Sequence, residues 1–154
     1  LFKTVFLGDD VDGDRLDANL AQFRTRLNET DGRLSGQLAS LKGIGLFTYH
    51  DAFSRFTEHY GLRVAGILTG SPEKTPGAKH LNDIKQRLQK EKHACLLKEP
   101  QFELRWWGAL AQGLPVSVVE WDPLGHAIPL GADGYMQFLE ALGRDALQCL
   151  KPAG

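Results

Sequence analysis

The sequence lacks an excess of charge of either sign, and it lacks any long hydrophobic run. Its 154 residues hold 18 Lys and Arg against 19 Asp and Glu, which gives a formal net charge of -1. This balance leaves no basic surface of the kind that binds a phosphate backbone, so nucleic acid is not an expected partner. The apolar runs are only a few residues long, whereas a membrane-spanning helix needs roughly 20.

The start of the chain also lacks an initiator methionine and a basic segment followed by an apolar one. We therefore expect a signal peptide to be absent or already removed, and the chain to be part of a longer protein. With 42% hydrophobic and 24% charged residues, the composition is that of one ordinary globular domain, or one domain with an appendage.

Several catalytic motifs are missing as well. The sequence contains no G-x-S-x-G, no Walker-type Gly-Lys-Ser/Thr and no H-E-x-x-H. It has only two cysteines, Cys95 in an apolar strand-like run and Cys149 at the end of the last helical pattern. Because neither belongs to a C-x-x-C, a zinc ribbon or a thioredoxin-like redox centre is not predicted. The residues alone leave open whether the two are free thiols or form a bridge.

A long amphipathic helix is predicted over residues 13–41. Apolar residues recur there at steps of 3, 4 or 7, from Leu16 to Leu41, which places them in one stripe along a helix. Asp10, Asp12, Asp14 and Asp17 surround its start, where carboxylates accept hydrogen bonds from free amides and favour the positive end of the helix dipole. Residues 1–12 are left as an N-terminal segment of uncertain structure.

From residue 42 onward, strand and helix patterns alternate. Strands are predicted over 43–49, 62–68, 93–97 and 115–121, and helices over 52–60, 78–92, 101–112 and 135–150. Strands separated by helices form right-handed crossovers, so we expect an α/β lobe over residues 42–154, with a four-stranded parallel sheet covered by helices on both faces.

A parallel sheet gathers its ligand-binding residues at the carboxyl ends of its strands. His50, Glu99 and Asp122 follow the first, third and fourth predicted strands. Imidazole and carboxylate groups suit zinc or another first-row divalent ion, but they also form catalytic dyads and cap strand ends. The residues alone leave these three interpretations open.

Five ordered motifs then resemble one known family. They are Tyr49-His-Asp-Ala-Phe-Ser-Arg-Phe56 with Glu58-His-Tyr-Gly-Leu62, Pro72-Glu-x-x-Pro-Gly-Ala78, Glu99-Pro-Gln-Phe102, Asp122-Pro-Leu-Gly125 and Leu130-Gly-x-x-x-Tyr-x-x-Phe-Leu139. Together they are similar to the ZnuA-like periplasmic zinc-binding subunits of bacterial ABC importers, within the wider family of metal-binding solute-binding proteins.

The resemblance implies a specific architecture and site. Members have two α/β lobes joined by one long helix, with the metal held between the lobes. The chain would then comprise the linking helix and the carboxyl-terminal lobe, and its partners would be the missing amino-terminal lobe and the transporter's membrane subunits, its only link to the membrane. His50 and Asp122 would bind transported Zn²⁺. Cys95 and Cys149 would form a disulfide in the periplasm, and no enzyme activity is expected.

Two alternatives remain at this stage. The metal could be manganese or iron, although the softer imidazole of His50 favours zinc. The chain could instead be a small hydrolase with His50 as base and Asp122 or Glu99 as the orienting carboxylate. His126, four residues beyond Asp122, and Glu99 are candidate auxiliary ligands. Without its partner lobe, part of the apolar stripe from Leu16 to Leu41 would be bare, which predicts self-association.

Overall fold

The long helix α2 (Gly13–Leu38) begins at the cap that the aspartates predict. The computed structural model describes residues 12–71, 76–102 and 105–151, so most of the segment 1–12 lies outside the described residues. Asp12 Oδ1 accepts hydrogen bonds from the backbone amides of Asp14 and Arg15, both at 3.1 Å. The α-helix ends at Leu38, and one 3₁₀ turn, η1 (Ala39–Leu41), continues it to the end of the predicted stripe.

The rest of the chain forms the predicted parallel sheet, which confirms the fold class. Its strands are β1 (Gly45–Thr48), β2 (Val64–Ile67), β3 (Ala94–Lys98) and β4 (Val116–Glu120), in the spatial order β2-β1-β3-β4. The connecting helices are α3 (Ser54–His59), α4 (Ala78–Lys90), α5 (Arg105–Ala111) and α6 (Gly134–Ala146), the last followed by the 3₁₀ turn η2 (Leu147–Leu150). The division into a linking helix and a lobe stays a prediction.

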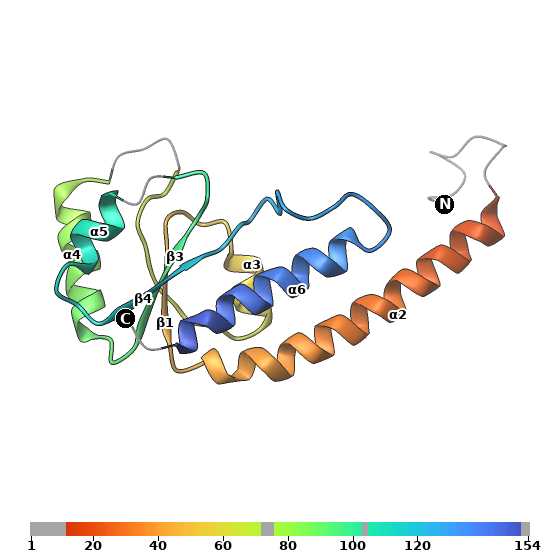
Figure 1. Ribbon diagram of the computed structural model, residues 1–154, viewed down its shortest axis with the longest axis horizontal. Helices are drawn as coiled ribbons and strands as arrows, with labels where there is room; N and C mark the ends of the chain where they lie inside the picture. The colour runs from red at the N-terminus through yellow and green to blue at the C-terminus, as the bar shows by residue number, and fades with distance from the viewer. Residues whose placement is uncertain (1–11, 72–75, 103–104, 152–154) are drawn as a thin grey trace.

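Helices cover both faces of the sheet (Figure 1). One hydrophobic cluster, which includes Leu46 and Trp121, lies under the end of α2 with α3 and α6. The other, which includes Phe47 and Trp107, lies under α4 and α5. Successive residues of a strand point to opposite faces, so the adjacent Leu46 and Phe47 belong to different clusters.

The helices α2 and α6 lie side by side and run in the same direction (Figure 1). Arg26 pairs with Asp133, and Arg33 pairs with Glu140, which lie seven residues, or about two turns, further along. The start of α2 extends beyond α6, and there Leu16, Leu20 and Phe23 are 36%, 43% and 38% exposed. The apolar stripe is therefore buried only in its second half.

Cys95 of β3 and Cys149 of η2 form the predicted disulfide, with their Cα atoms 5.5 Å apart. Both residues are fully buried in the cluster that α6 covers. Because the cysteines are 54 positions apart, the bridge lowers the entropy of the unfolded chain. In the chain-entropy model this raises the free energy of unfolding by about 4 kcal/mol. The bridge fixes the end of α6 to the centre of the sheet.

Candidate metal centre

The predicted ligands lie at one edge of the sheet, at the carboxyl ends of its strands. Thr48, Leu97 and Val119 are paired in a row across β1, β3 and β4. His50 and Glu99 follow that row by two residues. The strand order also reverses between β1 and β3, which is where α/β sheets of this kind open a ligand-binding crevice.

His50 is held by a buried carboxylate. Its Nδ1 lies 2.7 Å from Oε1 of Glu99, whose side chain is only 1% exposed, while His50 itself is 23% exposed. Burial raises the pKa of Glu99, and the charge and hydrogen bond of His50 act against that rise. With Nδ1–H donated to Glu99, the other ring nitrogen, Nε2, keeps its lone pair available for a metal ion.

An aromatic stack supports the same ring. Phe102 contacts the His50 imidazole edge-on at 5.7 Å between ring centroids, and it stacks on Tyr49 at 4.7 Å. The His50 side chain is therefore limited both by a hydrogen bond and by packing.

Asp122 is held as a carboxylate by three donors. Its Oδ1 accepts from the Leu124 amide at 3.0 Å and from Gln101 Nε2 at 3.1 Å, and its Oδ2 accepts from the His126 amide at 2.7 Å. Burial alone would raise the pKa of Asp122, but these hydrogen bonds outweigh it and hold the pKa below its usual range. Asp122 therefore carries its charge at neutral pH.

The segment after β3 supplies one supporting side chain to each candidate ligand. Glu99 bonds to His50, and Gln101 bonds to Asp122. Sequence reasoning gave Gln101 no role, although it belongs to the Glu99–Phe102 motif and follows a strand that ends at this edge. Its place after β3, close to Glu99 in the sequence, could have indicated that Gln101 contacts the candidate ligands.

The other histidines differ in their surroundings. His126 lies at the same edge, with its Nδ1 3.3 Å from Oδ2 of Asp122. His59 instead bonds to Asp31 at 2.6 Å, and His80 donates to the carbonyl of Ile67 at 2.9 Å. Among residues 12–71, 76–102 and 105–151, no group of three or more His, Cys, Asp or Glu side chains could hold a metal ion by itself.

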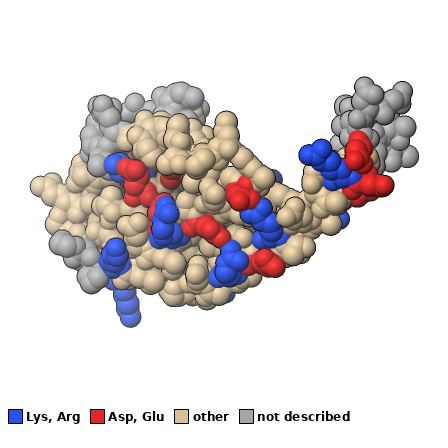
Figure 2. Space-filling model, turned by 45° about the vertical axis from the view of Figure 1, so that its right-hand side comes forward, with Lys and Arg blue, Asp and Glu red and all other residues tan. Residues whose placement is uncertain are grey.

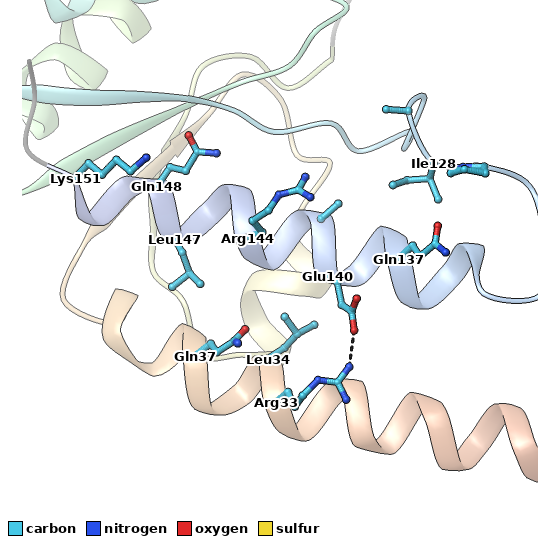
Figure 3. Close-up of a pocket in the computed structure, with 13 residues that line it drawn as sticks. Arg33, Leu34, Gln37, Ile128, Gln137, Glu140, Arg144, Leu147, Gln148 and Lys151 are labelled. Carbon is cyan, nitrogen blue, oxygen red and sulfur yellow. Dashed lines mark hydrogen bonds and ion pairs between the residues drawn. The ribbon is translucent and has the colours of Figure 1, made fainter.

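A groove also lies elsewhere on the molecule. It encloses about 930 Å³ between α2, α6 and residues 127–129, and none of His50, Glu99 or Asp122 lines it (Figure 3). The Arg33–Glu140 ion pair crosses it (Figure 3). On the face drawn in Figure 2, acidic and basic side chains lie next to one another over the body of the molecule.

Comparison with protein families shows to which family the chain belongs. The family model described as "Zinc-uptake complex component A periplasmic", ZnuA, matches residues 9–147. The chain belongs to the ZnuA family. The resemblance seen in the five motifs is thereby confirmed, and this is a family of solute-binding receptors rather than of enzymes.

Curated ZnuA relatives match nearly the whole chain. The high-affinity zinc uptake system protein ZnuA of Yersinia pestis is 38% identical over 138 residues, which are 90% of this chain and 43% of that protein. The protein of the same name from Haemophilus ducreyi is 39% identical over 132 residues, 86% of this chain and 43% of that protein. The chain thus spans less than half the length of these relatives.

Solved structures show the same fold as this ZnuA-family chain. The periplasmic zinc-binding protein TroA of Treponema pallidum superposes with a TM-score of 0.67 at 21% identity, over 84% of this chain and 50% of that one. A crystal structure of ZnuA superposes with a TM-score of 0.66 at 22% identity, over 92% of this chain and 51% of that one. In the described part of the chain, no helix is both long and apolar enough to cross a bilayer.

Proposed function

We propose that the chain forms the carboxyl-terminal half of a periplasmic zinc receptor, which delivers Zn²⁺ to the membrane subunits of an ABC importer. The observation that carries the proposal is the His50–Glu99 pair, 2.7 Å apart at the edge where Asp122 also lies. A carboxylate on Nδ1 of a histidine is the usual partner of a metal-binding imidazole, because it fixes the tautomer and increases the basicity of Nε2.

Zn²⁺ is the cargo of this receptor, and the chain contributes two ligands to it. Nε2 of His50 and a carboxylate oxygen of Asp122 would bind the ion, with Glu99 and Gln101 holding them in place. Zinc in proteins takes four ligands in most closed sites. The remaining positions are supplied by a partner lobe, as the 43% coverage of the relatives suggests, or by water when that lobe is absent.

Zinc is favoured over manganese because the ligand that follows β1, His50, is an imidazole, and over iron because the curated relatives are named as zinc uptake proteins. Manganese prefers oxygen ligands, whereas imidazole suits zinc. The names of the relatives, high-affinity zinc uptake proteins, agree with this choice. Family membership favours a receptor over the alternative of a small hydrolase with a His50-based dyad.

Zinc titration by calorimetry tests the proposed site. We expect the 154-residue chain to bind Zn²⁺ weakly, because two protein ligands leave the other positions to water. His50→Ala and Asp122→Ala should each weaken binding by about tenfold or more. His93→Ala is the matched control, since His93 precedes β3 at the opposite edge of the sheet. Tight binding that His50→Ala leaves unchanged would show that the site is wrong.

A further inference from the structure

The strand β2 lies at one edge of the sheet and has a free side. It comes first in the order β2-β1-β3-β4, so among the described residues it pairs with β1 alone. The backbone groups on the free side of an edge strand can pair with a strand of another molecule, which is a common route to aggregation. We propose that two side chains of α4, His80 and Arg87, cover this edge and keep β2 from pairing with the β2 of a second copy. The inference is independent of the proposed zinc site.

The β2 segment carries no protection of its own. From Val64 to Ser71 the chain has no charged residue and no proline, the kinds of residue that usually protect an edge. A groove of about 510 Å³ runs along this segment between α3 and α4, which leaves room beside the strand. An uncharged strand can pair with a copy of itself without placing like charges opposite each other. The β2 of a second copy is therefore the partner that fits this edge.

Two carbonyls of β2 accept hydrogen bonds from α4 on that side. His80 donates from Nε2 to the Ile67 carbonyl at 2.9 Å, and Arg87 donates from Nη1 to the Ala65 carbonyl over a longer 3.4 Å. The next amide along the strand, that of Leu68, instead donates to β1. Since successive residues of a parallel strand direct their backbone groups to opposite sides, the backbone groups of Ile67 face away from β1. An added strand would need the same carbonyls as acceptors, so the two side chains occupy its place.

Close packing of α4 on β2 holds the two side chains there. His80, Ile84 and Arg87 are spaced four and three residues apart, which places them on one face of the helix. Ile84 is only 2% exposed, and a Cβ at Gly66 of β2 would lie 2.9 Å from its Cδ1, so the glycine allows this close approach. His80 and Arg87 flank this contact along the helix. Seven residues of helix advance about 10.5 Å and two residues of strand about 6.6 Å, which explains the longer reach of Arg87.

Light scattering tests the inference, in a background with Leu16→Gln and Leu20→Gln that removes the exposed stripe of α2 as a cause of association. We expect His80→Ala with Arg87→Ala to raise the mean mass by about twofold or more at concentrations where the background is one chain. Hydrogen exchange of the Ile67 amide should then become slower, because this amide faces the free side and pairs with the second copy. Far-UV circular dichroism confirms beforehand that the variant is folded.

Two further double variants in the same background separate the edge from other causes. Asn82→Ala with Lys85→Ala removes one amide and one positive side chain from α4 at exposed positions that do not line the groove, so the mass should not change. His80→Gln with Arg87→Lys keeps a hydrogen-bond donor at each position and should remain one chain.

Three results would overturn the inference. The first is a mass of one chain for His80→Ala with Arg87→Ala at every concentration. The second is a rise in mass without slower exchange of the Ile67 amide, which would place the association elsewhere. The third is equal association of either further variant, which would mean that the two donors are not what protects the edge. None of these measurements involves zinc, so their outcome is separate from that of the proposed function.

Discussion

At the scale of single residues, Glu99 is the carboxylate that is buried among the described side chains. Its burial does not add to the stability of the fold at neutral pH. Its pKa is raised because burial disfavours the charged form. A group with a raised folded-state pKa stabilises the fold at low pH and loses that contribution as the pH rises through the folded value. The benefit at neutral pH is therefore the orientation of His50 rather than stability.

The pKa of Asp31 is shifted in the opposite direction from that of Glu99. Its Oδ1 accepts from His59 Nε2 at 2.6 Å and from the Tyr60 hydroxyl at 2.9 Å, which joins α2 to the end of α3. The hydrogen bond from His59, with that from Tyr60, holds the pKa of Asp31 below its usual range. The resulting stability is present above the unfolded value of about 3.9 and is lost as the pH falls through the lower folded value.

We therefore expect Asp31→Asn to lower the free energy of unfolding at about pH 6 and to lower it less at about pH 2.5, because the advantage of the charged wild-type carboxylate decreases as the pH falls. Urea unfolding at the two pH values measures the difference. Asp83→Asn, at an exposed position of α4, is the control for the loss of one negative charge. An Asp31→Asn penalty that is the same at both pH values would contradict this account.

At the scale of elements, the contact between α2 and α6 depends on Gly143. A Cβ built at Gly143 would overlap with Cδ2 of Leu34, which is only 2% exposed and belongs to the core. In contrast, a Cβ at Gly36 of α2 would have no atom within 4 Å. The two glycines belong to the same helix pair, but only one of them is required by packing.

We expect Gly143→Ala to lower the free energy of unfolding by about 1–3 kcal/mol, because overpacking outweighs the gain in helix propensity. Gly36→Ala should be neutral or raise it by up to about 1 kcal/mol, since alanine is the better helix former and meets no neighbour. Urea unfolding of both variants measures the contrast. Equal stability of the two would show that α6 moves away from α2 without cost.

At the scale of the whole molecule, the first half of α2 presents apolar side chains that the described structure buries only in part. Leu16, Leu20 and Phe23 belong to the stripe whose second half, Leu34 and Leu38, is in the core. Exposed apolar surfaces of this kind mark association sites. In the intact receptor we expect the partner lobe to cover them.

The isolated chain should therefore self-associate. Light scattering should show a mass that rises above one chain with concentration, and the double variant Leu16→Gln with Leu20→Gln should reduce that rise. The control is Leu130→Gln, because Leu130 is fully exposed but lies outside α2. A wild-type mass of one chain at every concentration would contradict the prediction.

The repeating patterns of the sequence determined the secondary structure and the fold class. The stripe from Leu16 to Leu41 and the alternating strand and helix patterns are local signals, so they predict helices and strands without knowledge of distant contacts. Strands that alternate with helices run parallel, so their carboxyl ends share one edge of the sheet, and this is why the sequence alone assigns His50 and Asp122 to the same edge. The disulfide came from the family resemblance, because two cysteines alone do not specify a bridge.

Only the tertiary structure decided which side chains meet at that edge. His50 and Glu99 are 49 positions apart, and Gln101 and His126 are 25 apart, so no local pattern relates them. Their contacts depend on the pairing of β1 with β3 and on the turn that follows β4, and a shift of one residue in either would separate them. The sequence thus determined the elements and the edge, whereas packing and strand register determined the geometry of the site.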